Sequence, residues 1–384
     1  MLRFQFDSPP RLVCQRGAAL ALAPWLQARA CMHAFVVTDP GLVRAGVVGA
    51  PVDALRAAGL RVTVYDQVEA DPPEHVVLAA VQAARDAGAD GVIGLGGGSS
   101  LDTAKLVALL AATPQALPDI YGPNRARGPR LPLVQVPTTA GTGSEATPTS
   151  VVSTPDHQKR GVISPLLLPD VAVLDATLTL GLPPAPTAMT GIDAMVHAIE
   201  AYTTRHLKNP VSDALAVRAL QLLHTHLGRA VQHGDDLDAR EGMLLGSALA
   251  GMAFANAPVA AIHALAHPLG SHFHVPHGLA NALVMVPVLR FNLPVAGHLY
   301  AELARALDPA WLGKGEAVAA DAFITLMAQH VSQAPIPQRL RDVGIAAPEV
   351  PTLAQAAMDV RRLLDNNLRD VQESDALALY SESF

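Results

Sequence analysis

The first 180 residues alternate between apolar runs with the length of buried strands and segments with helical periodicity. These strand-like runs, in which most residues are apolar, are residues 34–37, 61–65, 91–95, 131–136 and 171–174. Helical segments lie between them, as at residues 51–58 and 73–87. Parallel strands need such crossover helices, and continuous apolar strands are typical of a sheet that is covered on both faces. The pattern predicts an α/β fold with a parallel, doubly wound sheet, preceded by a short hairpin from residues 2–6 and 11–13.

A cluster of prolines at residues 183, 184 and 186 ends this alternation. Beyond it, apolar residues follow helical spacing in segments 187–202, 211–226, 238–254, 295–307, 317–331 and 352–366. A chain of 384 residues is long enough for two domains. We therefore expect an α/β, Rossmann-like domain over residues 1–182 and an all-α domain over residues 183–384.

The helical half contains an unusual concentration of histidines. Residues 251–281 hold five of the fifteen histidines of the chain, and two of them, His263 and His267, are four apart and share one helical face. Pro268 predicts a kink or break just after them. Asp193 and His197 are also four apart. A carboxylate with imidazoles on inward faces of neighbouring helices suits a divalent transition metal, although surface or core histidine pairs have the same spacing.

A glycine-rich turn follows the third apolar run and reads GGGSSLDTAK from Gly96 to Lys105. Where a strand enters a helix through such a turn, free N–H groups and the helix dipole can hold a phosphate. The turn is not the usual dinucleotide fingerprint, because Ser99 stands where the last glycine belongs. A tight turn capped by Ser99 and Asp102 is the alternative interpretation.

Two further segments suit a nucleotide. The strand at residues 131–136 is followed by PTTAGTGSEAT, from Pro137 to Thr147, which is rich in hydroxyls and poor in bulk. Asp39 follows the first apolar run, where a carboxylate can accept a hydrogen bond from an adenosine ribose and repel a 2′-phosphate. Asp39 therefore predicts NAD rather than NADP, unless it only forms the turn before Pro40.

Composition excludes several classes of function. A net charge of −7 with dispersed basic residues argues against nucleic acid as the main partner. Cys14 and Cys31 are expected to be thiols in a reducing compartment. The first residues lack the apolar core of a signal peptide, and we find no uncharged run of about 18 apolar residues. We therefore expect a cytoplasmic protein with no membrane span.

The motifs together resemble those of the iron-containing (group III) alcohol dehydrogenase family. The resemblance rests on Asp193-Ala-Met-Val-His197, on His263-Ala-Leu-Ala-His267, and on Pro276-His277-Gly in the same order and spacing. It extends over essentially the whole chain, and the GGGS turn and the PTTxGTGSE loop belong to it. It implies a dinucleotide-binding first domain and a metal-binding, catalytic second domain. The implied reaction is hydride exchange between NAD and a primary alcohol or aldehyde, in a homo-oligomer.

The resemblance also implies roles for individual residues. The metal ligands would be Asp193, His197, His263 and His277, holding Fe²⁺ or, by the same donor set, Zn²⁺. His267 would be catalytic, and Thr149 and Phe254 would line the substrate pocket. His272 and His274 have no such role and are expected to line the pocket or face solvent. The cofactor would contact Asp39, Gly96, Gly97, Gly98, Ser99, Asp102, Thr138, Thr139, Thr142, Ser144, Thr147, Lys159 and Leu178.

Two departures from the family pattern stand near these sites. Ala260 replaces a glycine, and Asp71 replaces an asparagine, so no cofactor contact is expected of Asp71. The alternative function is that of a metal-independent, maleylacetate-reductase-like oxidoreductase, which the intact pair of Asp193 and His197 disfavours.

Overall fold

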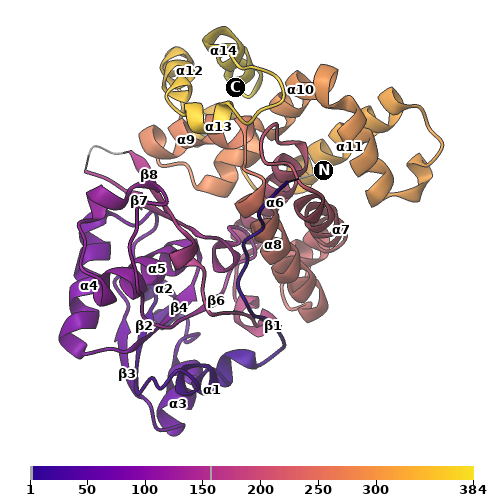
Figure 1. Cartoon of the computed structure of the whole chain (residues 1–384). Helices are drawn as coiled ribbons and strands as arrows, with labels where there is room; N and C mark the ends of the chain where they lie inside the picture. The colour runs from indigo at the N-terminus through magenta and orange to yellow at the C-terminus, as the bar shows by residue number, and fades with distance from the viewer. Residues whose placement is uncertain (1–2, 156–157) are drawn as a thin grey trace. The chain divides into compact units, whose positions relative to one another are not determined.

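The computed structural model describes residues 3–155 and 158–384, which form two compact units. The first is Asp7–Gly181, and the second is Leu182–Phe384 together with the described residues before Asp7. In Figure 1 the strands and their helices run from indigo to magenta, and the later helices run from red-brown to yellow.

The first unit contains a sheet of six parallel strands in the order β1-β9-β6-β4-β2-β3. Its strands are β1 Leu12–Cys14, β2 His33–Val37, β3 Arg61–Tyr65, β4 Gly91–Gly96, β6 Leu133–Pro137 and β9 Val171–Leu174. Its helices are α1 Ala23–Gln27, α2 Pro40–Arg44, α3 Gly49–Ala57, α4 Glu74–Ala87 and α5 Gly98–Ala112, with 3₁₀ turns η1 Ala18–Leu20, η2 Leu117–Ile120, η3 Ser144–Ala146, η4 Pro165–Leu167 and η5 Ala176–Thr179. The predicted parallel α/β fold is confirmed.

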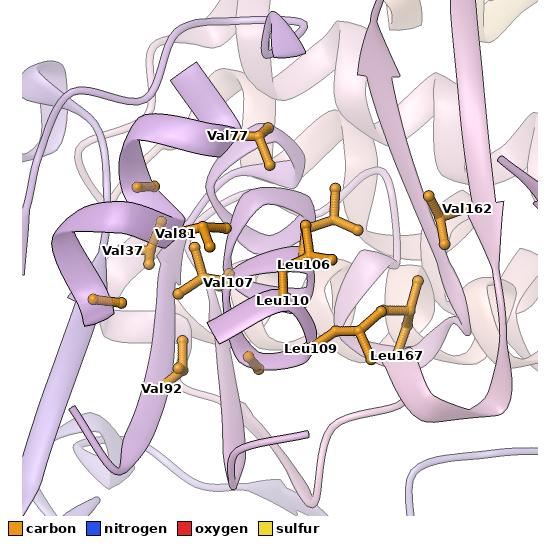
Figure 2. Close-up of a cluster of buried hydrophobic side chains, with 14 of the residues drawn as sticks. Val37, Val77, Val81, Val92, Leu106, Val107, Leu109, Leu110, Val162 and Leu167 are labelled. Carbon is orange, nitrogen blue, oxygen red and sulfur yellow. The ribbon is translucent and has the colours of Figure 1, made fainter. Parts of the chain in front are cut away.

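Side chains alternate between two apolar cores along the central strands. On β2, Phe35 and Val37 join one cluster, whereas Ala34 and Val36 join the other. The first cluster is formed with α4 and α5 (Figure 2), and the second includes residues of α1 and α3 such as Leu26 and Leu55. Because successive residues of a strand point to opposite faces, both faces of the sheet are buried.

The second unit is helical. Its helices are α6 Pro184–Thr203, α7 Pro210–Gln232, α8 Leu237–Asn256, α9 Ala261–Phe273, α10 His277–Leu307, α11 Glu316–Gln333, α12 Val350–Met358, α13 Arg361–Leu364 and α14 Glu373–Glu382, with 3₁₀ turns η6 Pro309–Trp311, η7 Leu340–Val343 and η8 Ala347–Glu349. By length and composition α10 could cross a membrane, as could α8 and α9 taken as one bent pair. In α10, however, 67% of the tested stretch is buried inside the protein, as expected of a core helix.

The predicted opening hairpin is wrong. Among the described residues before β1 there is no strand, and β1 pairs in parallel with β9, from Leu12 with Ala172 to Cys14 with Leu174. Sequence reasoning also missed a small second sheet in the order β5-β8-β7. Its strands are β5 Gly122–Pro123, β7 Thr149–Ser153 and β8 Lys159–Ile163.

Of the kink or break predicted just after the first histidine pair, the break is absent, because α9 continues through Pro268 to Phe273. Leu265 and Leu269, on either side of the proline, are fully buried, so tertiary packing outweighs the missing backbone hydrogen bond. In the same way α10 runs unbroken through Pro287 and Pro294.

Candidate functional site

Four candidate ligands converge within the helical unit. Asp193 and His197 lie on α6, His263 lies on α9, and His277 is the first residue of α10. One ligand atom from each side chain lies within 4.8 Å of the corresponding atoms of the other three. Asp193 Oδ1 is 3.9 Å from His263 Nε2 and 3.5 Å from His277 Nε2. The structure therefore brings together the four residues that the family resemblance implied as ligands.

Three of the four candidate ligands are buried, and His277 is partly exposed. Only 3% of the Asp193 side chain and 5% of the His263 side chain are exposed, against 31% for His277. Burial by itself raises the pKa of Asp193, but the neighbouring imidazoles, His197 foremost, hold the pKa of this carboxyl below its ordinary value. A buried, anionic carboxylate among three imidazoles, one of them partly exposed, suits a catalytic metal site, in which one coordination position is left for the substrate.

The amide of Asn281 provides a test of whether a cation fits this cluster. Its Nδ2 is 2.6 Å from Asp193 Oδ1 and 3.3 Å from the Nε2 atoms of His263 and His277. One positively polarised group thus lies where three acceptor atoms converge. A carboxylate and imidazole nitrogens that converge in this way fit Fe²⁺ or Zn²⁺. Sequence reasoning missed Asn281, although it stands four residues after His277 and so shares its helical face.

Glu200 is a second buried residue that sequence reasoning missed. Its Oε2 accepts a hydrogen bond from His263 Nδ1 at 2.7 Å, on the ring edge opposite Nε2. Glu200 follows Asp193 by seven residues and His197 by three, so all three project from one face of α6. That spacing was the signal that could have identified it.

The other aromatic side chains of this region have distinct positions. The ring of Phe254, on α8, stacks on the ring of His197 at 4.3 Å between centroids. His267 is half-buried one turn after His263, with its ring 6.4 Å from that of His277. The ligand cluster identified within residues 3–155 and 158–384 does not include His267. His272 and His274 are both exposed, as one of the two expected placements requires.

Gly278 allows α10 to begin against the α6 backbone. A Cβ at this position would lie 2.3 Å from the backbone oxygen of Met189, which cannot move aside as a flexible side chain would. Gly278→Ala should therefore lower the free energy of unfolding of metal-free protein by roughly 1–3 kcal/mol and weaken metal binding. Gly297→Ala, on the same helix with no atom closer than 3.8 Å, is the matched control. Urea unfolding and metal titration of both variants measure this effect, and equal behaviour would contradict it.

In the α/β unit, the predicted nucleotide segments meet at the carboxyl edge of the sheet. Asp39 follows β2, Gly97 follows β4, and Thr138 follows β6, and these three strands are neighbours. Thr138 N donates to the carbonyl of Gly96 at 3.0 Å. Ligands of doubly wound folds bind outside this edge, so the arrangement suits a dinucleotide.

The glycine turn has the geometry of an anion site. Gly97 is the N-cap of α5 and provides no side-chain cap, so the interpretation of Ser99 and Asp102 as a capping box is wrong. The Oγ of Ser99 accepts instead from the backbone N–H of Asp71, at 3.2 Å. At Gly98 a Cβ would lie 2.7 Å from Thr142 Cγ2, so the turn and the hydroxyl-rich loop are in close contact. The first N–H groups of α5 therefore remain available for a phosphate.

A buried lysine that sequence reasoning missed connects several predicted cofactor residues. Lys105 Nζ donates to Ser144 Oγ at 2.9 Å, to Thr147 Oγ1 at 3.1 Å and to the carbonyl of Thr149 at 2.6 Å. Asp102 accepts from Ser144 Oγ at 2.5 Å. Burial lowers the pKa of Lys105 and raises that of Asp102, although each charge opposes the shift of the other. Ser144, Thr147 and Asp102 thus fix the shape of the loop.

The remaining predicted cofactor residues are held by local contacts. Asp39 is the N-cap of α2, and its Oδ1 accepts from the N–H groups of Gly41 and Leu42 at 2.8 and 3.0 Å. Lys159 pairs with Asp71 at 2.8 Å. Thr139 lies beside the turn, 3.6 Å from where a Cβ on Gly97 would stand, and Leu178, in η5, packs against the second apolar core.

Known proteins resemble the chain along most of its length. The family model of iron-containing alcohol dehydrogenase matches residues 9–176, and that of the Fe-containing alcohol dehydrogenase family, C-terminal, matches residues 187–384. A probable alcohol dehydrogenase EutG from Salmonella typhimurium is 40% identical over 377 residues, which cover 98% of this chain and 93% of the relative. A solved structure of 1,3-propanediol oxidoreductase is 34% identical, with a TM-score of 0.96 and complete coverage of both chains. Another, of sulfoacetaldehyde reductase from Bifidobacterium kashiwanohense in complex with NAD⁺, is 26% identical, with a TM-score of 0.90 over 100% of this chain and 99% of that one. The chain therefore belongs to the iron-containing alcohol dehydrogenase family, as its histidine and glycine motifs predict.

Proposed function

We propose that the enzyme exchanges hydride between NAD and a primary alcohol, or a short diol or hydroxy acid, at a divalent cation. That it is an NAD-dependent alcohol dehydrogenase that uses a metal follows from its family. The proposed ligands are Asp193, His197, His263 and His277. Residues 183–384 would form the metal-binding, catalytic domain, and residues 1–182 the dinucleotide-binding domain.

One observation supports the ligand assignment above all others. Four donor atoms from three helices lie within 4.8 Å of one another, with the Asn281 amide among them. When bound, the cation would supply Lewis-acid catalysis at the substrate oxygen, and the nicotinamide would accept or donate the hydride. The side chain of His277 is 31% exposed, so we propose that the substrate reaches the cation beside this residue. Elemental analysis of the purified protein tests the assignment, with one Fe²⁺ or Zn²⁺ expected per chain.

We assign the proton chemistry to His267. Oxidation of an alcohol releases a proton, and imidazole is the side chain that titrates near neutral pH without perturbation. His267 is half-buried, one helical turn from His263, and outside the ligand cluster of the described chain. It can therefore exchange a proton or order the cofactor while the ligands hold the metal.

The dinucleotide would lie along the carboxyl edge of the sheet. Its pyrophosphate would bind the N–H groups of the glycine turn, and its adenosine ribose would bind Asp39. Contacts are proposed for Asp39, Gly96, Gly97, Gly98, Ser99, Asp102, Thr138, Thr139, Thr142, Ser144, Thr147, Lys159 and Leu178. For Asp102, Ser144 and Thr147 the internal bonds favour support of the loop over direct side-chain contact.

We predict that Asp39 makes the enzyme prefer NAD to NADP. Asp39 Oδ1 caps α2. A 2′-phosphate beside this carboxylate would be repelled by its like charge, so kcat/KM with NADP should be roughly tenfold or more below kcat/KM with NAD. Asp39→Gly should reduce the difference in kcat/KM between NAD and NADP. Asp39→Asn should also reduce it, while it keeps the side-chain oxygen that caps α2. Asp53→Asn, which removes an exposed carboxylate of α3, is the matched control. Equal or better kcat/KM with NADP in the unaltered enzyme would contradict the prediction.

The substrate is proposed to be small and polar. Two of the solved relatives, 1,3-propanediol oxidoreductase and sulfoacetaldehyde reductase, have names that denote a short alcohol or aldehyde with a second polar group. Phe254, stacked on His197, and Thr149 are proposed to line the pocket. Kinetics with primary alcohols, diols and hydroxy acids, after loading with Fe²⁺ or Zn²⁺, test the class. No turnover with any of them would contradict it.

We also propose a homo-oligomer, a dimer or larger, in the cytoplasm. Neither Cys14 nor Cys31 forms a disulfide in the described part of the chain, consistent with a reducing compartment. Light scattering at working concentration measures the oligomeric state, and a monomer would contradict that part of the proposal.

A further inference from the structure

We infer that Glu200 is a positioning residue of the metal centre, which fixes both the ring and the backbone of His263. The inference rests on the proposed ligand set, in which His263 is a ligand. Glu200 is 3% exposed, and its two carboxylate oxygens receive three hydrogen bonds from the first turn of α9.

The first contact orients the imidazole. His263 Nδ1 lies 2.7 Å from Glu200 Oε2, and a carboxylate oxygen accepts there, so Nδ1 must carry the proton. The Nε2 of a neutral ring then holds the lone pair, and it faces Asp193 Oδ1 at 3.9 Å and Asn281 Nδ2 at 3.3 Å. This is the tautomer that a metal requires, and a carboxylate behind the ring also makes the ligand more basic.

The other two contacts anchor the backbone. Ala260 is the N-cap of α9, and its side chain provides no cap. Glu200 takes over that function from another helix, because Oε2 accepts from Ala260 N at 2.9 Å and Oε1 accepts from Ile262 N at 2.7 Å. A negative charge is also favourable at the positive end of the helix dipole. His263 is the third residue of α9, so the capped turn is the turn that carries it.

The position of Glu200 on α6 links all three functions. The same helix face carries Asp193, His197 and Glu200, and thus supplies two ligands and the support of a third. A displacement of α9 would move His263 away from the two ligands on α6. Glu200 acts on the metal only through His263, so its loss should weaken metal binding without removing a ligand.

The test compares Co²⁺ and Zn²⁺ binding by unaltered protein and by Glu200→Gln. The amide retains one acceptor for three donors and directs its own N–H groups at the others, so metal affinity should fall roughly 10- to 100-fold. The visible d–d spectrum of bound Co²⁺ should change as well, since the geometry of His263 changes. Glu302→Gln is the matched control, because this exposed residue of α10 accepts a hydrogen bond from Tyr202 and is not in the ligand cluster of the described residues, so its metal affinity should equal that of the unaltered protein.

Three outcomes separate this inference from the proposed ligand set. His263→Ala is measured in parallel, and if it binds metal as tightly as the unaltered protein, the ligand set is wrong. If His263→Ala loses the metal but Glu200→Gln keeps the affinity and Co²⁺ spectrum of the unaltered protein, only the role of Glu200 is overturned. If Glu200→Gln does not fold, Glu200→Asp takes its place. Its shorter side chain cannot reach all three donors, and an unchanged metal affinity and spectrum would overturn the inference equally.

Discussion

Replacing His263 or Asp193 by alanine should abolish both bound metal and turnover. Asp193 is the only carboxylate in the ligand cluster found among the described residues, and the ring of His263 is held by a hydrogen bond to Glu200. Loss of either one leaves the site without its only anionic donor or without the imidazole that Glu200 orients, so metal binding should weaken enough for the ion to be lost during purification. Elemental analysis should give one ion per chain for the unaltered enzyme and close to none for either variant.

Chelation should have the same effect as these substitutions and should be reversible. Removal of the metal should stop alcohol oxidation, and addition of Fe²⁺ or Zn²⁺ should restore it, because the folded protein retains the donor set. For the His263 substitution, His272→Ala is the matched control, since His272 lies exposed on the same helix. This variant should keep its metal and its activity. Full activity in a metal-free preparation would contradict the account and favour the metal-independent, maleylacetate-reductase-like alternative.

His267→Ala should retain its metal and lose roughly 10²- to 10⁴-fold in kcat, which is the range for general acid–base catalysis. The pH dependence of kcat should flatten too, because an imidazole that takes part in the proton transfer is removed. Steady-state kinetics across pH, combined with metal analysis, measure both effects. Loss of metal would make His267 a ligand, and retention of metal with unchanged turnover would make it a packing residue; either result contradicts the assignment.

Much of the fold was predictable from the sequence because its signals are local. The runs that became β2, β4, β6 and β9 are mostly apolar, with His33 and Gln135 as exceptions, as expected of strands that are covered on both faces. The predictions failed where contacts between residues distant in the sequence determine the local structure. Pro268 is accommodated because Leu265 and Leu269 are buried around it, and β1 finds its partner about 160 residues along the chain rather than in a hairpin.

The metal ligands could be found because helical spacing places Asp193 and His197 on one face, and because the motifs resemble a known family. Glu200, Asn281 and Lys105 could not be singled out in the same way. Nothing in the sequence distinguishes each of them from the other polar residues of its helix. Its role depends on the donors and acceptors that tertiary packing brings into contact with it. A polar residue three or four positions from a candidate ligand is nevertheless a usable signal, because it shares the same helix face.

The proposed metal site holds one divalent cation at the junction of α6, α9 and α10. Anomalous X-ray diffraction from crystals of Fe²⁺- or Zn²⁺-loaded protein, measured on both sides of the absorption edge of the metal, tests it most directly. The account predicts one peak per chain, bonded to the carboxylate of Asp193 and to the imidazoles of His197, His263 and His277, with His267 not bonded. A peak elsewhere in the chain, or a peak bonded to His267 in place of one of these ligands, would contradict it.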